Sequence, residues 1–144
     1  MLFTIDKAFA EVITWCATVE RKLESGTWIT PQMIRTYHEF HKEGHAHSVE
    51  VWEGTQLVGG IYGVDGCGSF SGESMFTLRP NASKLALLFL IDHLKSRGLD
   101  WIDIQMLTPH MEGMGAKSIP RSEFLERLAA TQQRQLVLFP RAVS

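Results

Sequence analysis

The 144-residue chain has the length of one ordinary domain, with 44% apolar and 21% charged residues, proportions typical of globular proteins. Its net charge of −2 argues against a dedicated duplex-DNA binder, which carries a strong excess of Lys and Arg on one face. No apolar run approaches the roughly 20 residues that span a bilayer, and the N-terminus has no signal-sequence pattern. We therefore expect one domain over residues 1–144, cytoplasmic and without a membrane partner.

Two helices are predicted at the start of the chain. Apolar residues at helical spacing predict the first over residues 6–23. Thr30 followed by Pro31 is typical of an N-cap and a first helical position, and predicts a second helix that ends near Lys42.

Three consecutive antiparallel strands are predicted next, over residues 48–52, 56–64 and 69–76. The residues Glu53-Gly54-Thr55 form the first turn signal, and two glycines mark the second. The change from helical to alternating patterns indicates that a sheet follows the helical pair.

A buried helix and a further strand come after the three strands. Asn81 as a cap and Gly98 after the last turn predict a helix over residues 84–97. A short strand is predicted over residues 101–105. Strand, helix and strand form a βαβ unit, so residues 69–76 and 101–105 should be parallel neighbours.

The end of the chain predicts a last helix capped by Ser122 and an edge strand over residues 136–139. The resulting order, ααβββαβαβ, is that of an acetyltransferase-like (GNAT-type) α/β fold. This fold, also classed as α+β, has a mixed, mainly antiparallel sheet flanked by helices, and its ligand lies where adjacent strands splay.

Four histidines are close in sequence: His38, His41, His45 and His47. Gly44 interrupts their helix, and no Glu stands where an HExxH zinc site requires one. The interpretation that we favour is helix-end and loop histidines, and we expect no metal.

Two polar groups have an open interpretation. Glu73 lies among small and apolar residues, where a buried carboxylate is costly unless it is paired; alternatively, it points to solvent. Asp103 and Gln105 are two residues apart on a strand and so share one face. That face can orient an incoming amine, or it can be the ordinary solvent face of an edge strand.

The segment before the helix of the predicted βαβ unit argues against coenzyme A. Acetyl-CoA-dependent members of the fold hold the pyrophosphate with backbone N–H groups of a glycine-rich, basic loop. The corresponding residues 79–84 contain no glycine, and Pro80 lacks an N–H donor. Coenzyme A is therefore disfavoured.

Several longer motifs occur together in order along the chain. They are Gly26-Thr27-Trp28-Ile29-Thr30, Tyr37-His38, residues 44–52, residues 57–64, Gly72-Glu73-Ser74-Met75-Phe76, Asn81-Ala82-Ser83-Lys84, Ile102-Asp103-Ile104-Gln105, Gly115-Ala116 and Ile119-Pro120-Arg121. With these motifs the chain resembles the leucyl/phenylalanyl-tRNA–protein transferase family, from about Ile5 to Arg121.

The resemblance implies an aminoacyltransferase that moves Leu or Phe, and also Met, from aminoacyl-tRNA to the N-terminal Arg or Lys of an acceptor protein. This transfer marks the acceptor for degradation and uses no cofactor. The resemblance implies that Asp103 and Gln105 position the attacking amine and that Glu73 helps to hold the cationic acceptor. The aminoacyl pocket would be lined by Ile61, Phe70, Met75, Leu90 and Ile102, and the terminal adenosine would be held by Trp28 and Tyr37.

The chain departs from the family in two respects. We expect the chain to lack the family's N-terminal domain and basic segment, and a second copy of the chain or a separate subunit could replace them. Leu90 stands where the resemblance leads us to expect Phe, which would alter the aminoacyl pocket. A related acyltransferase with another aminoacyl or acyl donor, and a non-catalytic binding remnant, are the alternatives.

Overall fold

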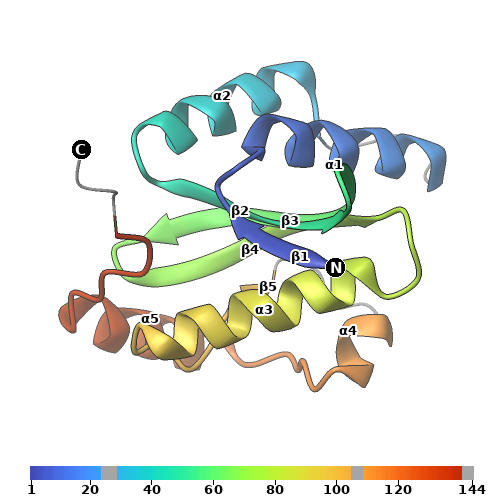
Figure 1. Ribbon diagram of the computed structural model, residues 1–144. Helices are drawn as coiled ribbons and strands as arrows, with labels where there is room; N and C mark the ends of the chain where they lie inside the picture. The colour runs from blue at the N-terminus through green and yellow to red at the C-terminus, as the bar shows by residue number, and fades with distance from the viewer. Residues whose placement is uncertain (24–28, 105–108, 141–144) are drawn as a thin grey trace.

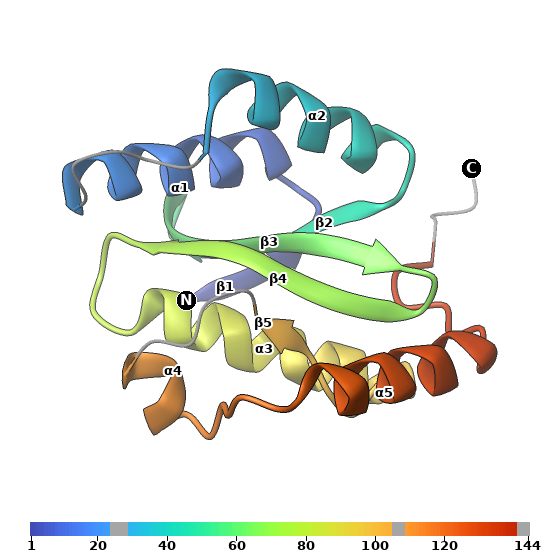
Figure 2. The same cartoon turned by 180° about the vertical axis from the view of Figure 1, so that it is seen from behind.

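The computed structural model describes residues 1–23, 29–104 and 109–140, and it has a five-stranded sheet between two layers of helices (Figures 1 and 2). In chain order the elements are β1 (Leu2–Ile5), α1 (Phe9–Leu23), α2 (Pro31–Lys42), β2 (Ala46–Glu53), β3 (Gln56–Gly66), β4 (Ser69–Thr77), α3 (Ala82–Ser96), β5 (Asp103–Ile104), α4 (Pro109–Gly113) and α5 (Arg121–Gln133). The helices α1 and α2 cover one face, and α3, α4 and α5 lie on the other. None of the described helices has the length and apolar character that crossing a membrane requires.

The sheet confirms the predicted fold class and the βαβ unit. Its strand order is β1-β2-β3-β4-β5, with antiparallel pairs up to β4. The last pair is parallel, with Ser71 opposite Asp103 and Gly72 opposite Ile104. The capping prediction for α2 also holds, since the Met33 N–H donates to Thr30 Oγ1 at 3.1 Å.

The start of the chain differs from the prediction. Residues Leu2–Ile5 form an edge strand paired with β2, and α1 begins at Phe9 rather than at residue 6. Asp6 separates the two elements with a φ of 58°. Its N–H donates to the Ser48 carbonyl, while its Oδ1 accepts from the Ser48 N–H. These bonds fix Asp6 to β2 and prevent helix α1 from starting there.

The starts of α3 and α5 and the predicted strand at the end of the chain also differ from the prediction. Helix α3 starts at Ala82, and Asn81 precedes it in a left-handed conformation without a side-chain cap. Helix α5 starts at Arg121, so Ser122 lies inside the helix rather than at its cap. Residues 136–139 form no strand. Instead, Leu138 is fully buried and its carbonyl lies 2.6 Å from His93 Nε2.

A β-bulge interrupts the pairing of β3 with β4. Tyr62 lies opposite Ser74, but Gly63 lies opposite Gly72, which leaves Glu73 as the extra residue on β4. A bulge re-aims the side chains that follow it. As a result Phe70 and Phe76, which simple alternation would place on one face, belong to the two different core layers.

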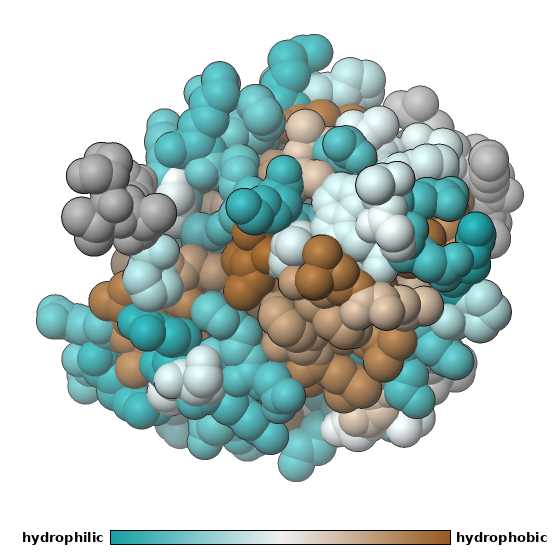
Figure 3. Space-filling model, in the orientation of Figure 1, coloured by the Kyte–Doolittle hydropathy of each residue, from teal (hydrophilic) through white to brown (hydrophobic). Residues whose placement is uncertain are grey.

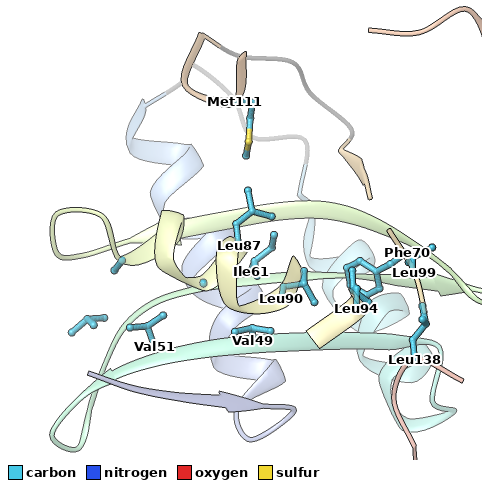
Figure 4. Packing of buried hydrophobic residues seen from close by; sticks show 13 residues of the cluster. Val49, Val51, Ile61, Phe70, Leu87, Leu90, Leu94, Leu99, Met111 and Leu138 are labelled. Carbon is cyan, nitrogen blue, oxygen red and sulfur yellow. The ribbon is translucent and has the colours of Figure 1, made fainter. Parts of the chain in front are cut away.

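The core has one cluster on each face of the sheet. The cluster beneath α3 includes Ile61, Leu87 and Leu90, and Figure 4 shows these side chains packed between the helix and the strands. The other cluster joins α1 and α2 to the opposite face. Outside the core, apolar side chains gather on the surface over β1 and α3 (Figure 3), where Phe3 stacks on Phe89.

Candidate active site

Two cavities adjoin at Asp103. The large cavity, of about 670 Å³, lies between α3, β5, α4 and α5. The small cavity, of about 370 Å³, lies between α2, β3, β4 and α5. Asp103, Trp101 and Phe124 line both cavities. A carboxylate at the junction of two cavities can interact with two ligands at once.

The large cavity has apolar walls and a cationic rim. Its apolar lining residues are Leu87, Leu88, Ile91, Ile102, Ile104, Met111, Met114, Ala116 and Ile119, together with the shared aromatic residues. Figure 4 shows Met111 on the far side of this space from Leu87. The cations are Lys117, Arg121 and Arg127. This cavity suits a ligand with an apolar group and negative charges.

The small cavity combines carboxylates, hydroxyl groups and aromatic rings. Its lining residues are Tyr37, Phe40, Val64, Gly66, Ser69, Phe70, Ser71, Glu73, Leu128 and Gln132, besides the three shared residues. The Ser71 hydroxyl donates to Asp103 Oδ2 at 3.3 Å. Both charged residues of this lining are acidic, so the small cavity suits a cation.

Burial, together with this crowding of acidic groups, raises two pKa values in the small cavity. Burial raises the pKa of Glu73, and the negative charge of Asp103 raises it further. Burial also raises the pKa of the Tyr37 hydroxyl, with a smaller contribution from Glu73. Tyr37 therefore keeps its proton at neutral pH and can donate a hydrogen bond. A cation in the small cavity would relieve the repulsion between the two carboxylates.

Two backbone features bring the acidic residues together. Asp103 lies opposite Ser71 because β5 pairs in parallel with β4. Glu73 is the bulged residue two positions further along β4. The bulge occurs where Gly63 crosses β4 so closely that an added Cβ would lie 2.2 Å from the Ser71 carbonyl oxygen. Glycine at position 63 is therefore required for this arrangement.

The structure brings some of the predicted site residues together and not others. Glu73, Asp103, Tyr37 and Phe70 line the small cavity, and Ile102 lines the large one. Gln105 and Trp28 lie outside the described residues. The remaining predicted pocket residues, Ile61, Leu90 and Met75, line neither cavity and pack in or against the core beneath α3.

Helix α5 supplies lining residues that the sequence analysis missed. Trp101 Nε1 donates to Thr131 Oγ1 at 2.9 Å, and Gln132 Nε2 donates to the Gly66 carbonyl at 3.1 Å. These bonds hold α5 against the end of the sheet, where Phe124 reaches both cavities. The spacing of Phe124, Leu128 and Thr131 is the signal by which this face could have been recognised.

The histidines take part in structural contacts. His47 Nδ1 lies 2.6 Å from Asp6 Oδ2, and its Nε2 lies 3.0 Å from the Gly44 carbonyl oxygen. His41 Nδ1 lies 2.9 Å from the Ala46 carbonyl oxygen, and its ring stacks on Phe9. Within the ranges that the structure describes, no three His, Cys, Asp or Glu side chains are grouped to hold a metal ion.

Comparison with known proteins identifies related sequences. The family described as leucyl/phenylalanyl-tRNA protein transferase matches residues 1–129. A transferase of that name from Shewanella sp. (strain W3-18-1) is 49% identical over 140 residues, which are 97% of this chain and 58% of the relative. One from Lawsonia intracellularis is 53% identical over 125 residues, 87% of this chain and 55% of the relative. The chain thus spans somewhat more than half the length of these relatives.

Solved structures agree on the fold. A probable acetyltransferase matches with a TM-score of 0.64 and 7% identity, over 83% of this chain and 92% of its own. A predicted acetyltransferase with acetyl-CoA from Clostridium acetobutylicum matches with a TM-score of 0.56 and 15% identity, over 83% and 93%. At such identities the likeness shows the fold alone.

Proposed function

Because the chain belongs to the leucyl/phenylalanyl-tRNA protein transferase family, we propose that it transfers Leu, Phe or Met from aminoacyl-tRNA to the N-terminal Arg or Lys of an acceptor protein. The transfer marks the acceptor for degradation. The observation that carries this proposal is the meeting, at Asp103, of a cavity with cationic and apolar lining and a cavity with acidic lining. An anionic RNA donor and a cationic acceptor need opposite surroundings of this kind.

The acceptor would occupy the small cavity. An N-terminal Arg or Lys carries one charge on its α-amine and another on its side chain. Glu73 and Asp103 supply two carboxylates, and the rings of Tyr37 and Trp101 can add cation–π attraction. A peptide that begins with Ala lacks the second charge, so this cavity should favour Arg and Lys.

Asp103 would position the acceptor amine for attack. An α-amine with a pKa of about 7.7–8.0 needs only about 1 kcal/mol to lose its proton at neutral pH. The neutral nitrogen attacks the ester carbonyl, an amide bond forms, and the ester C–O bond breaks as the ribose oxygen leaves with a proton. Because the ester is already activated, holding the two groups together supplies most of the acceleration. Gln105, the family's second polar residue, is proposed to help Asp103.

The donor's aminoacyl side chain would occupy the large cavity beside Ile102. Burial of each methylene there is worth about 0.8 kcal/mol, which favours Leu, Phe and Met. Ile61 and Leu90 are each 1% exposed, so the donor reaches them only if the side chains in front move. Phe70 and Met75 belong to or pack against the same cluster. We propose that these four residues lie behind the lining of the aminoacyl pocket and limit its shape. The predicted adenosine contact of Trp28 stays a prediction; because Tyr37 lines the small cavity, we assign it to the acceptor instead of the adenosine.

The decisive experiment follows labelled Leu or Phe from charged tRNA onto peptides that begin with Arg, Lys or Ala. We expect transfer to the Arg and Lys peptides and little to the Ala peptide. Equal transfer to all three would contradict the acceptor assignment. If transfer and RNA binding were both absent, a non-catalytic binding role would be favoured instead.

The alternative is an acyltransferase with another donor, and the fold shared with acetyltransferase structures does not distinguish it from the first proposal. Stabilisation against heat by acetyl-CoA would support it.

A second copy of the chain or a separate subunit in place of the relatives' remaining length stays a prediction. Light scattering on the purified chain can test whether two copies associate. The cytoplasmic location likewise stays a prediction.

A further inference from the structure

The large cavity carries positive charge that the amine chemistry does not use. Lys117, Arg121 and Arg127 line it beside a single carboxylate, Asp103, although the whole chain has a net charge of −2. Arg127 lies 3.4 Å from Glu123 and 6.0 Å from the centre of the Trp101 ring system. In the described parts of the chain, neither Lys117 nor Arg121 forms an ion pair. Two cations on the rim of this cavity are thus available to a ligand.

Local structure explains how these cations gather at one cavity. Arg121, Phe124 and Arg127 recur every three residues along α5, so they share one face of the helix. Lys117 lies four residues before Arg121, in the segment that joins α4 to α5. All four residues line the large cavity. The face that α5 presents to this cavity therefore has an aromatic ring between two guanidinium groups.

The ligand that fits this cavity has an apolar or aromatic body with negative charges attached. The volume of the large cavity, about 670 Å³, lies in the range of small-ligand sites, about 300–1,000 Å³. Guanidinium groups bind phosphate oxygens in a bidentate manner, and an ammonium group binds them as a point charge. Phosphate groups next to a base or an apolar side chain match both parts of the lining.

We propose that Lys117 and Arg121 bind backbone phosphates at the 3′ end of the donor RNA, close to the nucleotide that carries the aminoacyl ester. This inference rests on the proposed function, because it names the residues that hold the donor of that reaction. The phosphates would lie at the rim, and the ester would point inward to Asp103. Both cations act as binding and positioning residues and take no part in bond formation.

The test uses the whole 144-residue chain and a short single-stranded RNA that ends in the ACCA sequence of tRNA. The variant is Lys117→Ala with Arg121→Ala. The matched control is Arg35→Ala with Lys42→Ala, which removes one Arg and one Lys from exposed positions of α2, outside the lining of both cavities. The dissociation constant is measured over a range of salt concentrations, and transfer is measured on full charged tRNA.

We expect the cavity variant to bind the RNA about tenfold more weakly at low salt, while the control binds like the wild type. Because a single-strand phosphate contact contributes about 0.7 to the slope of log K against log salt, the slope should become shallower by about 1.4. A role in folding alone would not change this slope. For transfer, we expect a higher KM for charged tRNA with kcat little changed.

The outcomes separate the two proposals. If the wild type transfers Leu or Phe, but the cavity variant matches the control in affinity, salt slope and KM, this inference is overturned and the proposed function stands. If the wild type binds no RNA and transfers nothing, both are overturned. If acetyl-CoA binds in a manner that depends on Lys117 and Arg121 and the RNA does not, the cations serve a coenzyme and the RNA assignment is wrong.

Discussion

At the scale of single residues, Asp103 has the position with the largest consequences, because it lines both cavities and accepts a hydrogen bond from Ser71. Asp103→Asn keeps the size of the side chain and an oxygen for Ser71, but removes the negative charge. We expect transfer to fall by about a hundredfold or more, measured with charged tRNA and an Arg peptide. The thermal unfolding midpoint should stay near that of the wild type. A fully active Asn variant would show that the charge of Asp103 does not position the amine.

Glu73 makes a prediction about pH. Burial and Asp103 raise its pKa, so as the pH falls it gains a proton at a higher pH than an exposed Glu would. Its attraction for the cationic acceptor is present above this raised pKa and is lost below it. We therefore expect the acceptor KM of the wild type to rise as the pH falls, starting at a higher pH than titration of an exposed Glu would cause.

The variant Glu73→Gln should have a high acceptor KM throughout, without that rise. Glu126→Gln is the matched control, since Glu126 is exposed on α5 and lines neither cavity. Identical pH profiles for the wild type and Glu73→Gln would exclude Glu73 from acceptor binding.

At the scale of elements, the packing of α3 on β3 depends on a glycine. A Cβ added at Gly59 would lie 2.6 Å from the Ala82 Cβ and 3.1 Å from its carbonyl carbon. Gly59→Ala should therefore push α3 away from β3 and lower the free energy of unfolding by about 1–3 kcal/mol. Gly113→Ala, in open space within α4, should be neutral or slightly stabilising. Denaturant unfolding of the two variants would compare them; equal stabilities would show that α3 adjusts freely.

Strand β1 is held to the sheet by the buried carboxylate of Glu50. Its Oε1 accepts from Thr4 Oγ1 at 2.6 Å and from the Lys7 N–H at 3.0 Å, while Oε2 accepts from the Ser48 hydroxyl. Glu50→Ala leaves these donors without their acceptor, and we expect a loss of about 2–4 kcal/mol in unfolding free energy. Glu50→Gln keeps one acceptor oxygen and should cost less.

The pH dependence of the Glu50→Gln variant has a definite sign. Burial raises the pKa of Glu50, despite the hydrogen bonds that favour its charged form. Ionisation therefore costs the folded wild type stability as the pH rises through the interval from the unfolded pKa to the raised pKa. The loss of unfolding free energy caused by Glu50→Gln, measured against the wild type at the same pH, should therefore be smaller at neutral pH than at acidic pH. A stability difference that did not change with pH would mean that Glu50 titrates like an exposed Glu.

At the scale of the whole molecule, the sequence predicts what local signals determine. Thr30 and Pro31 define the start of α2, and the βαβ unit fixes the parallel pair of β4 and β5. The strand β1 has no such signal, because its four residues gain their pairing from β2, more than forty positions away. The fold class followed from these local signals, but the predicted order ααβββαβαβ lacked β1 and α4 and placed a strand over residues 136–139, which form none.

The candidate site was only partly predictable for the same reason. Motif resemblance predicted Glu73 and Asp103 as site residues, but the bulge that places Glu73 depends on the pairing of Gly63 with Gly72. The walls that α5 contributes depend on bonds between distant residues, such as Gln132 and Gly66. Cavities formed by segments far apart in sequence leave no local pattern, so their division into a large and a small cavity required the structure.

The central claim, that donor and acceptor occupy separate cavities that meet at Asp103, can be tested by NMR titration of the isotope-labelled chain. One ligand is a phenylalanyl-adenosine analogue with an amide in place of the ester, and the other is a peptide that begins with Arg. We expect the analogue to shift the amide resonances of Met114 and Lys117, the peptide to shift those of Val64 and Gln132, and both to shift that of Asp103. If the two ligands compete for one set of residues, or if neither changes the Asp103 resonance, the two-cavity account is wrong.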